Sequence, residues 1–277
     1  GLTYIGAGQT LTNTGTGKIY GNHIALDAQK LLNREETTEG STKAGAIAAR
    51  KRLDIGAKEI HNQEGALLSS EGIFAIGNRL DEQHHAAGMA DTFVNGSASL
   101  EVQGDALMSV RNMQNINNHF KTEAYLAKAE KQVRDYTVLG QNTYYQAVKD
   151  GLFDNSHGKK DQTTATFHLN NGSRIEANQW HVRDYHIETY KERITENRPA
   201  HNTVGGNLTA SGQDWLNKDS RIVVGGRIIT DDLNQKEITN QSTTGKGRID
   251  AVGTQWDSVT ERRTYSGRKR QRRTEKN

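Results

Sequence analysis

Short runs in which apolar and polar residues alternate recur along the chain, and each ends in an asparagine. The repeated frame reads apolar, any, apolar, any, small, two spacers, apolar, any, Asn. It fits segments 24–33, 53–62 and 208–217, and also 4–13 with small residues substituted. Looser copies lie around 73–81, 100–112 and 238–240. A repeat too small to bury its own apolar face must stack on its neighbours, so the pattern predicts a stacked fold.

The spacing within each copy is that of a strand. Alternation over four to five positions, followed by Gly or Asn, is typical of a half-buried β-strand. Glycine is scattered through every segment, and the one stretch compatible with a helix is 122–133. Short strands at a repeat of about 20 residues suit a parallel β-helix, whose coils pair about 4.8 Å apart. We therefore expect an all-β chain built as a parallel β-helix.

The asparagine that ends each copy is expected to have a structural role. Asn13, Asn33, Asn62 and Asn217 occupy this position. Asparagine at a fixed turn tolerates a left-handed backbone, and it can stack its amide on equivalent amides above and below. These four residues are therefore predicted to form a structural turn ladder.

A second repeat is superimposed on the first. Segment 172–182 corresponds to 247–259, and Val-Arg-Asp-Tyr occurs at both 133–136 and 182–185. These charged and aromatic segments read as strands, so we expect them to leave the β-helix as protruding β-hairpins. The predicted organisation is β-helix coils at 1–118, hairpin and loop excursions with an intervening coil at 119–203, coils at 204–256 and a basic strand or tail at 257–277.

The composition fits a thin, extended core. Of 277 residues, 28 are Gly, one is Pro and none is Cys, and 33% are hydrophobic. Compact domains of this length average nearer half apolar residues, so a compact single-core enzyme is disfavoured. No run approaches the roughly 18 apolar residues of a membrane-spanning helix, and the chain is not expected to span a membrane. The lack of cysteine excludes disulfides, Cys-ligated zinc and thiol catalysis.

Positive charge is concentrated near the C-terminal end. The net charge is +3, but residues 262–276 hold eight Lys or Arg against one acid. We interpret this segment as a solvated hairpin strand. Specific nucleic-acid binding is not expected, because Tyr265 is the only aromatic residue among the basic ones and no nucleic-acid-binding module surrounds it. The candidates for contact with an anionic surface are Arg268, Lys269, Arg270, Arg272 and Arg273.

The repeats resemble those of a known family. The resemblance is carried by the endings Leu11-Thr12-Asn13, Leu31-Leu32-Asn33, Ile60-His61-Asn62 and Trp215-Leu216-Asn217, the turn Val223-Val224-Gly225-Gly226, and the segments Asn118-His119-Phe120, Gln179-Trp180 and Gln255-Trp256. They look like the filamentous haemagglutinin repeats of two-partner-secreted exoproteins. That group includes filamentous haemagglutinin adhesins and the effector-delivery proteins of contact-dependent growth inhibition. The resemblance is clearest in 1–118 and 204–256.

The resemblance implies a right-handed β-helical filament, exported unfolded through the outer-membrane transporter of a two-partner secretion system. Such a segment would be secreted or displayed at the bacterial cell surface, as a non-catalytic shaft in adhesion, toxin delivery or virulence. Its second partner would be a target-cell surface receptor. The lack of cysteine agrees with such export. Because the chain opens on Gly1 without a signal segment, we interpret it as a fragment or a processed product.

The segments that depart from the repeat are the expected recognition surface. A regular shaft presents nearly the same face at every coil, whereas Tyr and Trp are favoured anchors at interfaces. The candidate partner-binding residues are Tyr136, Tyr144, Tyr145, Tyr185 and Tyr190. The opposing interpretation is that aromatic residues pack the hairpins onto the shaft, and it carries equal weight for Trp180, Trp215 and Trp256.

No catalytic residue, metal site or cofactor is predicted. The pairs His84 with His85 and His181 with His186 have spacings that place their side chains on opposite faces of a strand. The glycine-rich stretches 15–18 and 245–247 lack the rest of a phosphate-binding loop. The alternative is a β-helical polysaccharide-active enzyme, which would need two carboxylates about 5 to 10 Å apart. The acids available for it are Asp154, Asp161, Asp184, Asp214, Asp231 and Asp232.

Overall fold

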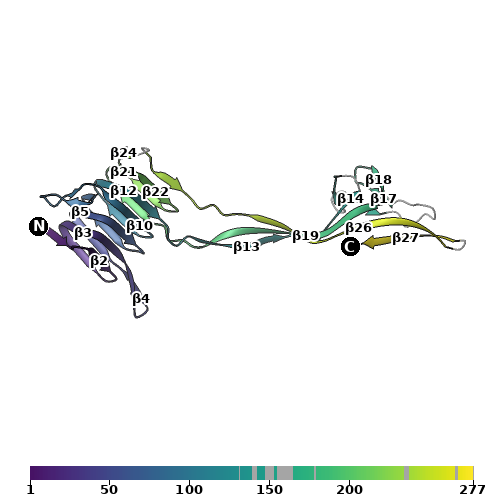
Figure 1. Ribbon diagram of the computed structural model, residues 1–277, viewed down its shortest axis with the longest axis horizontal. Helices are drawn as coiled ribbons and strands as arrows, with labels where there is room; N and C mark the ends of the chain where they lie inside the picture. Colours follow the sequence, from purple (N-terminus) through teal and green to yellow (C-terminus); the bar gives the residue numbers. More distant parts are fainter. Residues whose placement is uncertain are drawn as a thin grey trace. The chain divides into compact units, whose positions relative to one another are not determined.

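The chain is all-β throughout the part that the structure describes. The computed structural model describes residues 1–130, 132–138, 142–146, 153–154, 165–177, 179–233, 237–265 and 268–276, and within these ranges it has strands and no helix. The expectation of an all-β fold is thereby confirmed. The chain forms two compact units, shown in Figure 1. Unit 1 comprises 1–122 and 194–244, and unit 2 comprises 123–193 and 245–277.

These limits can be compared with the boundaries expected from the sequence. The expected excursion ran from 119 to 203, whereas the inserted part of unit 2 runs from 123 to 193. The second group of coils was expected to reach 256, but unit 1 ends at 244. Residues 245–277, which include the basic segment, are grouped with the inserted residues.

Unit 1 is built on a 16-stranded sheet in which all pairings except β3 with β4 are parallel. Its first strands are β1 (Leu2–Gly6), β2 (Thr10–Thr14), β3 (Lys18–Thr38), β4 (Ser41–Ala44), β5 (Ala46–Gln63), β6 (Leu67–Ser70), β7 (Ile73–Gly77), β10 (Ala90–Gly96), β11 (Ser99–Val102) and β12 (Ala106–Ile116). After the insertion come β20 (His201–Val204), β21 (Leu208–Gly212), β22 (Asp214–Lys218), β23 (Arg221–Val224), β24 (Ile228–Leu233) and β25 (Thr239–Gln241). The short strands β8 (Arg79–Leu80) and β9 (Ala86–Ala87) pair separately.

Parallel pairing places equivalent positions of the repeat in continuous rows. One row joins Leu31, Ile60, Phe93, Met113 and Trp215 through successive strand pairs, and all five side chains are buried. Each copy therefore contributes one side chain to a shared core, and no copy could bury this side chain alone. Trp215 belongs to this core, where its indole Nε1 donates to the Val110 carbonyl at 3.1 Å. The thin core inferred from the composition is supplied by such rows.

The asparagines form a hydrogen-bonded ladder beside the core. Each amide Nδ2 donates to the Oδ1 of the next asparagine at 2.7–2.9 Å, and most of these side chains are fully buried. The ladder runs Asn13, Asn33, Asn62, Asn95, Asn115, Asn217 and Asn240, and Asn95 also donates to Asn202. The four asparagines predicted from the sequence are all members of the ladder. The expected turn position is wrong, however, because all four lie within strands β2, β3, β5 and β22, and none has the left-handed backbone. Unpaired buried amides would be costly, so the ladder fixes which residues lie opposite one another.

The structure settles two segments for which the sequence pattern was weak. The looser copy around 100–112 does not place Asn112 in the ladder, because Asn115 occupies that position three residues later. The stretch 122–133, which was compatible with a helix, instead contains most of strand β13 (Lys121–Ala129). The side chains of β13 are all exposed, so its alanines cover no core. Pairing with a long neighbouring strand satisfies its backbone instead, and this tertiary constraint overrides helix propensity.

Unit 2 contains the remaining strands. They are the rest of β13, then β14 (Val133–Val138), β15 (Tyr145–Gln146), β16 (Phe153–Asp154), β17 (Ala165–His168), β18 (Arg174–Ala177), most of β19 (Gln179–Glu196), β26 (Arg248–Tyr265) and β27 (Arg268–Lys276). Antiparallel sheets join β14, β15, β19, β26 and β27, and separately β16, β17 and β18. The copies 172–182 and 247–259 were expected to leave the β-helix as protruding β-hairpins. Only their ends pair with each other, residues 179–182 with 256–259, whereas Arg174–Ala177 of the first copy pairs with β17.

Replacing a ladder asparagine should destabilise unit 1 far more than replacing its outward-facing neighbour. Asn115→Ala removes the acceptor for Asn95 and the donors to Asn217 and to the Arg221 carbonyl. Each buried polar group left unpaired costs about 1–3 kcal/mol, so the urea unfolding midpoint should fall clearly. The exposed Gln114 next to it in β12 is the matched control, and Gln114→Ala should change stability by less than about 0.5 kcal/mol. Equal midpoints for the two variants would contradict a structural role for the ladder.

Candidate functional site

The duplicated tetrapeptide Val-Arg-Asp-Tyr forms the centre of unit 2. Its two copies, 133–136 in β14 and 182–185 in β19, pair antiparallel with each other over their full length. Because the copies are identical and run in opposite directions, each arginine lies opposite the aspartate of the other copy. Arg134 pairs with Asp184, and Arg183 pairs with Asp135. Directly opposed residues of an antiparallel pair lie on the same face, so the two ion pairs occupy opposite faces of the sheet.

One face of this sheet is the apolar core of unit 2. Trp180 and Val182 are buried there, and Tyr136, Tyr145 and Trp256 pack against them. At one end of this face the Arg134 guanidinium donates from Nε to Asp184 at 3.1 Å and also contacts it through Nη2. The hydrogen bond from Arg134 lowers the pKa of Asp184 below its ordinary value, and Gln132 adds a smaller effect in the same direction.

The opposite face carries aromatic rings and charges beside solvent. We call it the Tyr144 face and define it as Asp135, Tyr144, His181, Arg183 and Tyr185. The Arg183 guanidinium lies 3.6 Å from the centre of the Tyr144 ring, and it donates to Asp135 at 2.9 Å. The Tyr185 hydroxyl donates to the same aspartate at 2.7 Å. The buried Asp135 thus holds Arg183 and Tyr185 in place, while 45% of Tyr144 stays exposed.

The structure separates the five tyrosines proposed from the sequence. Tyr144 and Tyr185 come together on the Tyr144 face, whereas Tyr136 and Tyr145 pack against the apolar core on the other side. Tyr190 lies farther along β19, where its hydroxyl donates to Glu188 at 2.8 Å and Arg248 lies 4.5 Å above its ring. Neighbouring residues of a strand point to opposite faces, which explains why Tyr144 and Tyr145 differ.

The candidates for contact with an anionic surface all lie in β27. This strand pairs antiparallel with β26 from Tyr265 opposite Arg268 to Asp257 opposite Lys276. The backbone of the basic segment is therefore the second strand of a hairpin, as interpreted from the sequence. The side chains of Arg268, Lys269, Arg270, Arg272 and Arg273 lie outside the described residues.

Three residues of the Tyr144 face, namely Asp135, His181 and Arg183, were not proposed from the sequence as part of a recognition surface. Arg183 orients Tyr144, and Asp135 holds Arg183, yet neither was proposed as part of a surface. The signal was present in the duplicated tetrapeptide, which was noted only as a repeat. Two identical strands with an adjacent Arg and Asp form reciprocal ion pairs when they pair antiparallel, and this relation could have located both residues.

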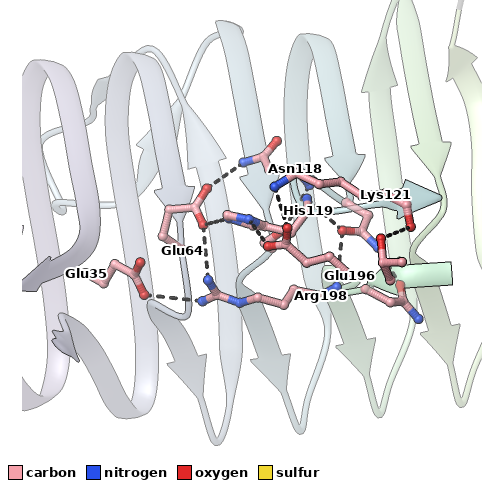
Figure 2. Close-up of polar contacts among 11 residues, drawn as sticks. Glu35, Glu64, Asn118, His119, Lys121, Glu196 and Arg198 are labelled. Carbon is pink, nitrogen blue, oxygen red and sulfur yellow. Dashed lines mark hydrogen bonds and ion pairs between the residues drawn. The ribbon is translucent and has the colours of Figure 1, made fainter. Parts of the chain in front are cut away.

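A second polar group lies in unit 1, where the chain leaves the sheet after β12 and returns before β20 (Figure 2). His119 lies between two carboxylates, with Nδ1 2.8 Å from Glu196 and Nε2 in contact with Glu64. Lys121 pairs with Glu196 at 2.6 Å. Hydrogen bonds from Lys121 and, more weakly, His119 lower the pKa of Glu196 below its ordinary value.

The returning segment is tied to the sheet by the same network. Arg198 pairs with Glu35 at 3.2 Å and with Glu64 at 3.8 Å, and Asn118 donates to Glu64 at 2.9 Å. We call this group the anchor cluster, and its members are Glu35, Glu64, Asn118, His119, Lys121, Glu196 and Arg198. Exposed ion pairs are individually worth about 0–1 kcal/mol. Because such pairs add little stability, we assign the anchor cluster a positioning role: it holds the outgoing and returning segments of the chain beside each other.

The acids considered for polysaccharide cleavage are divided between the two units. Asp184 is engaged by Arg134 in unit 2, whereas Asp214, Asp231 and Asp232 lie in β22 and β24 of unit 1. Asp161 and the side chain of Asp154 lie outside the described residues. Within the described ranges, no group of three or more His, Asp or Glu side chains could hold a metal ion. His84 and His85 contact different rings, Tyr4 and His23 respectively.

Comparisons with known proteins found no similar protein. No family model matches the sequence, and no curated protein and no solved structure is detectably similar to it. Among the residues whose structure is described, no helix is long and apolar enough to cross a membrane.

Acid should weaken unit 2 through Asp184. Its pKa lies below the ordinary value of 3.8 in the folded chain, so its contribution is complete above pH of about 3.8 and is lost as the pH falls through the folded value. In Arg134→Gln the depression disappears, and the fall in thermal midpoint between pH 6 and pH 3 should shrink. Arg174→Gln, which loses an exposed pair to Glu176, should behave like the parent.

Tryptophan emission measures this unfolding. In a Trp215→Phe background it reports on Trp180 and Trp256, which both belong to unit 2. An unchanged pH dependence in Arg134→Gln would contradict this role.

Proposed function

We propose that unit 1 is a segment of a right-handed parallel β-helix that serves as a non-catalytic shaft, and that unit 2 is a recognition element inserted between its coils. The observation that carries the proposal is the continuity of the ladder across the insertion. Asn115 donates directly to Asn217 at 2.8 Å, although 101 residues separate them in the sequence. Pairing of β12 with β22 continues in the same register, from Asn112 opposite Asp214 to Ile116 opposite Lys218.

Because the ladder is continuous, unit 1 can serve as the shaft while unit 2 serves in recognition. A strand insertion that disturbed the stack would leave buried amides unpaired, whereas this one leaves the rows intact. Unit 2 is free to carry side chains that no repeating row could supply. The chemistry of the Tyr144 face suits recognition, because Tyr and Arg are among the residues most enriched at the energetic centres of protein interfaces. Asp135 holds Arg183 and Tyr185 in place, which lowers the entropy lost on binding.

The proposed setting is the surface of a bacterial cell. The asparagine-terminated repeats resemble those of filamentous haemagglutinin-type exoproteins, and the chain contains no cysteine. Both features suit export as an unfolded chain through an outer-membrane transporter of a two-partner secretion system. Unit 2 would then contact a receptor on a target cell, in adhesion or in contact-dependent toxin delivery.

The proposal predicts saturable binding to target cells that depends on Tyr144. The labelled chain would be titrated onto intact bacterial and epithelial cells and measured by flow cytometry. Tyr144→Ala should weaken binding about tenfold or more, because it removes an exposed interface anchor. Tyr144→Phe keeps the ring over Arg183 and should retain most of the binding.

Tyr125→Ala supplies the matched control. Tyr125 is 37% exposed in β13, and its ring also lies beside an arginine, Arg193, at 5.5 Å. Its loss should leave binding unchanged, because it lies outside the Tyr144 face. Two results would refute the proposal: a folded chain that binds neither cell type, or saturable binding that is equal in Tyr144→Ala and the parent.

A further inference from the structure

A groove on unit 1 lies outside both the Tyr144 face and the anchor cluster. It has a volume of about 470 Å³, within the range of small-molecule sites. Strands β3, β5 and β6 and the residues that follow β6 form its walls and floor. The lining residues are Tyr20, Gly21, Asn22, Ala48, Ala49, Arg50, Ser69 and Glu71.

A local irregularity in the strand pairing creates this groove. Gly21 lies opposite Ala49, but His23 lies opposite Arg52, so Asn22 faces two residues of β5. Such a β-bulge bends the strand and redirects the side chains beside it. Next to the groove the backbone at Gly72 also approaches that of Lys51 closely. A Cβ atom at Gly72 would lie 2.1 Å from the Lys51 carbonyl oxygen. The regular rows of unit 1 are therefore interrupted here on their outer side.

One wall of the groove is an exposed aromatic ring. Tyr20 is 63% exposed, the most of any tyrosine on the described surface of the chain. Its row continues through Ala48 and Ser69, so strands β5 and β6 present only small side chains beside the ring. Among the residues that the structure describes, no other aromatic ring and no cation contacts the Tyr20 ring. An uncovered ring beside a floor of small residues suits a flat ligand with an apolar face.

The polar groups around the floor are also available. Within the described residues, the side chains of Asn22, Arg50 and Glu71 have no hydrogen-bond or ion-pair partner, although all three line one groove. Together they offer amide, guanidinium and carboxylate groups, which can donate to and accept from neighbouring hydroxyls. Arg50 and Glu71 are the only charged residues of the lining, and their charges cancel. The groove therefore favours a ligand rich in hydroxyls and without net charge.

We propose that this groove binds a neutral oligosaccharide. A sugar ring would stack its C–H face on Tyr20, while its hydroxyl groups would bond with Asn22, Arg50 and Glu71. The lining contains a single carboxylate, whereas glycoside hydrolysis ordinarily requires a pair. The groove is accordingly a binding site and not a catalytic one. It goes beyond the recognition role of unit 2, because none of its residues belongs to that unit.

Calorimetric titration of the full chain with defined tetrasaccharides tests the proposal. The neutral probes are cellotetraose, mannotetraose and the tetramer of N-acetylglucosamine, and tetragalacturonate is the acidic comparison. At least one neutral probe should bind, and Tyr20→Ala should weaken that binding about tenfold or more. Tyr20→Phe should keep it within about threefold, since the stacking face remains. Arg50→Gln should weaken it while leaving the folded state unchanged.

Tyr4→Ala is the matched control, because Tyr4 is 50% exposed in β1 but does not line the groove. Its affinity for the neutral probe should equal that of the parent. The proposal is overturned if the folded chain binds none of the neutral probes, if it binds only tetragalacturonate, or if Tyr20→Ala binds as tightly as the parent. Binding to cells through Tyr144 is a separate readout, so either proposal can fail while the other stands.

Discussion

The pairing of buried asparagine amides is the interaction on which the rest of unit 1 depends. An apolar row alone tolerates exchange of one large side chain for another, as Leu31, Ile60 and Phe93 show within a single row. A buried amide cannot be displaced in this way, because its donors and acceptors must be satisfied by the amides above and below. A slip of one residue in the pairing would turn the apolar row toward solvent. It would also leave the amides of the ladder without hydrogen-bond partners. The ladder therefore determines the register of strand pairing, and the hydrophobic rows stabilise the sheet once that register is formed.

A fixed register allows the chain to vary elsewhere. Unit 2 can be inserted between β12 and β20 because Asn115 still finds Asn217, and the anchor cluster holds the two ends of the insertion together. The β-bulge opposite Asn22 interrupts the regular pairing of β3 with β5 at one point. In both cases the departure from the repeat creates chemistry that a repeat cannot offer. We propose that these departures carry recognition while the repeating rows supply the shaft.

The sequence was sufficient for the features that repeat. Alternation and the terminal asparagine predicted the strands, and four ladder members could be named because their copies fit one frame. Asn95 and Asn115 were not found, since the copies around them are irregular. The strand β13 was ambiguous because it covers no core, and only its pairing with a distant strand decides its structure.

The candidate surface was harder to derive from the sequence, because face and partner are properties of pairing. The tyrosines could be named, but whether each faces solvent or the core depends on the register of β14 against β19 and β15. The groove at Tyr20 depends on one extra residue in β5 opposite Asn22, which leaves no mark in composition or periodicity. Contacts between distant segments, such as Glu35 with Arg198, had no signal in the sequence at all.

Engineered disulfide formation across the insertion tests the central claim most directly. The chain has no cysteine, so Gln114→Cys with Leu216→Cys creates one defined pair at directly opposed positions of β12 and β22. Neighbouring strands lie about 4.8 Å apart, within the Cα separation that a disulfide accepts. The account predicts nearly complete cross-linking on mild oxidation. Gln114→Cys with Lys218→Cys, offset by two residues to about 8 Å, should remain largely reduced. Failure of the first pair to cross-link, or equal cross-linking of both, would contradict the account.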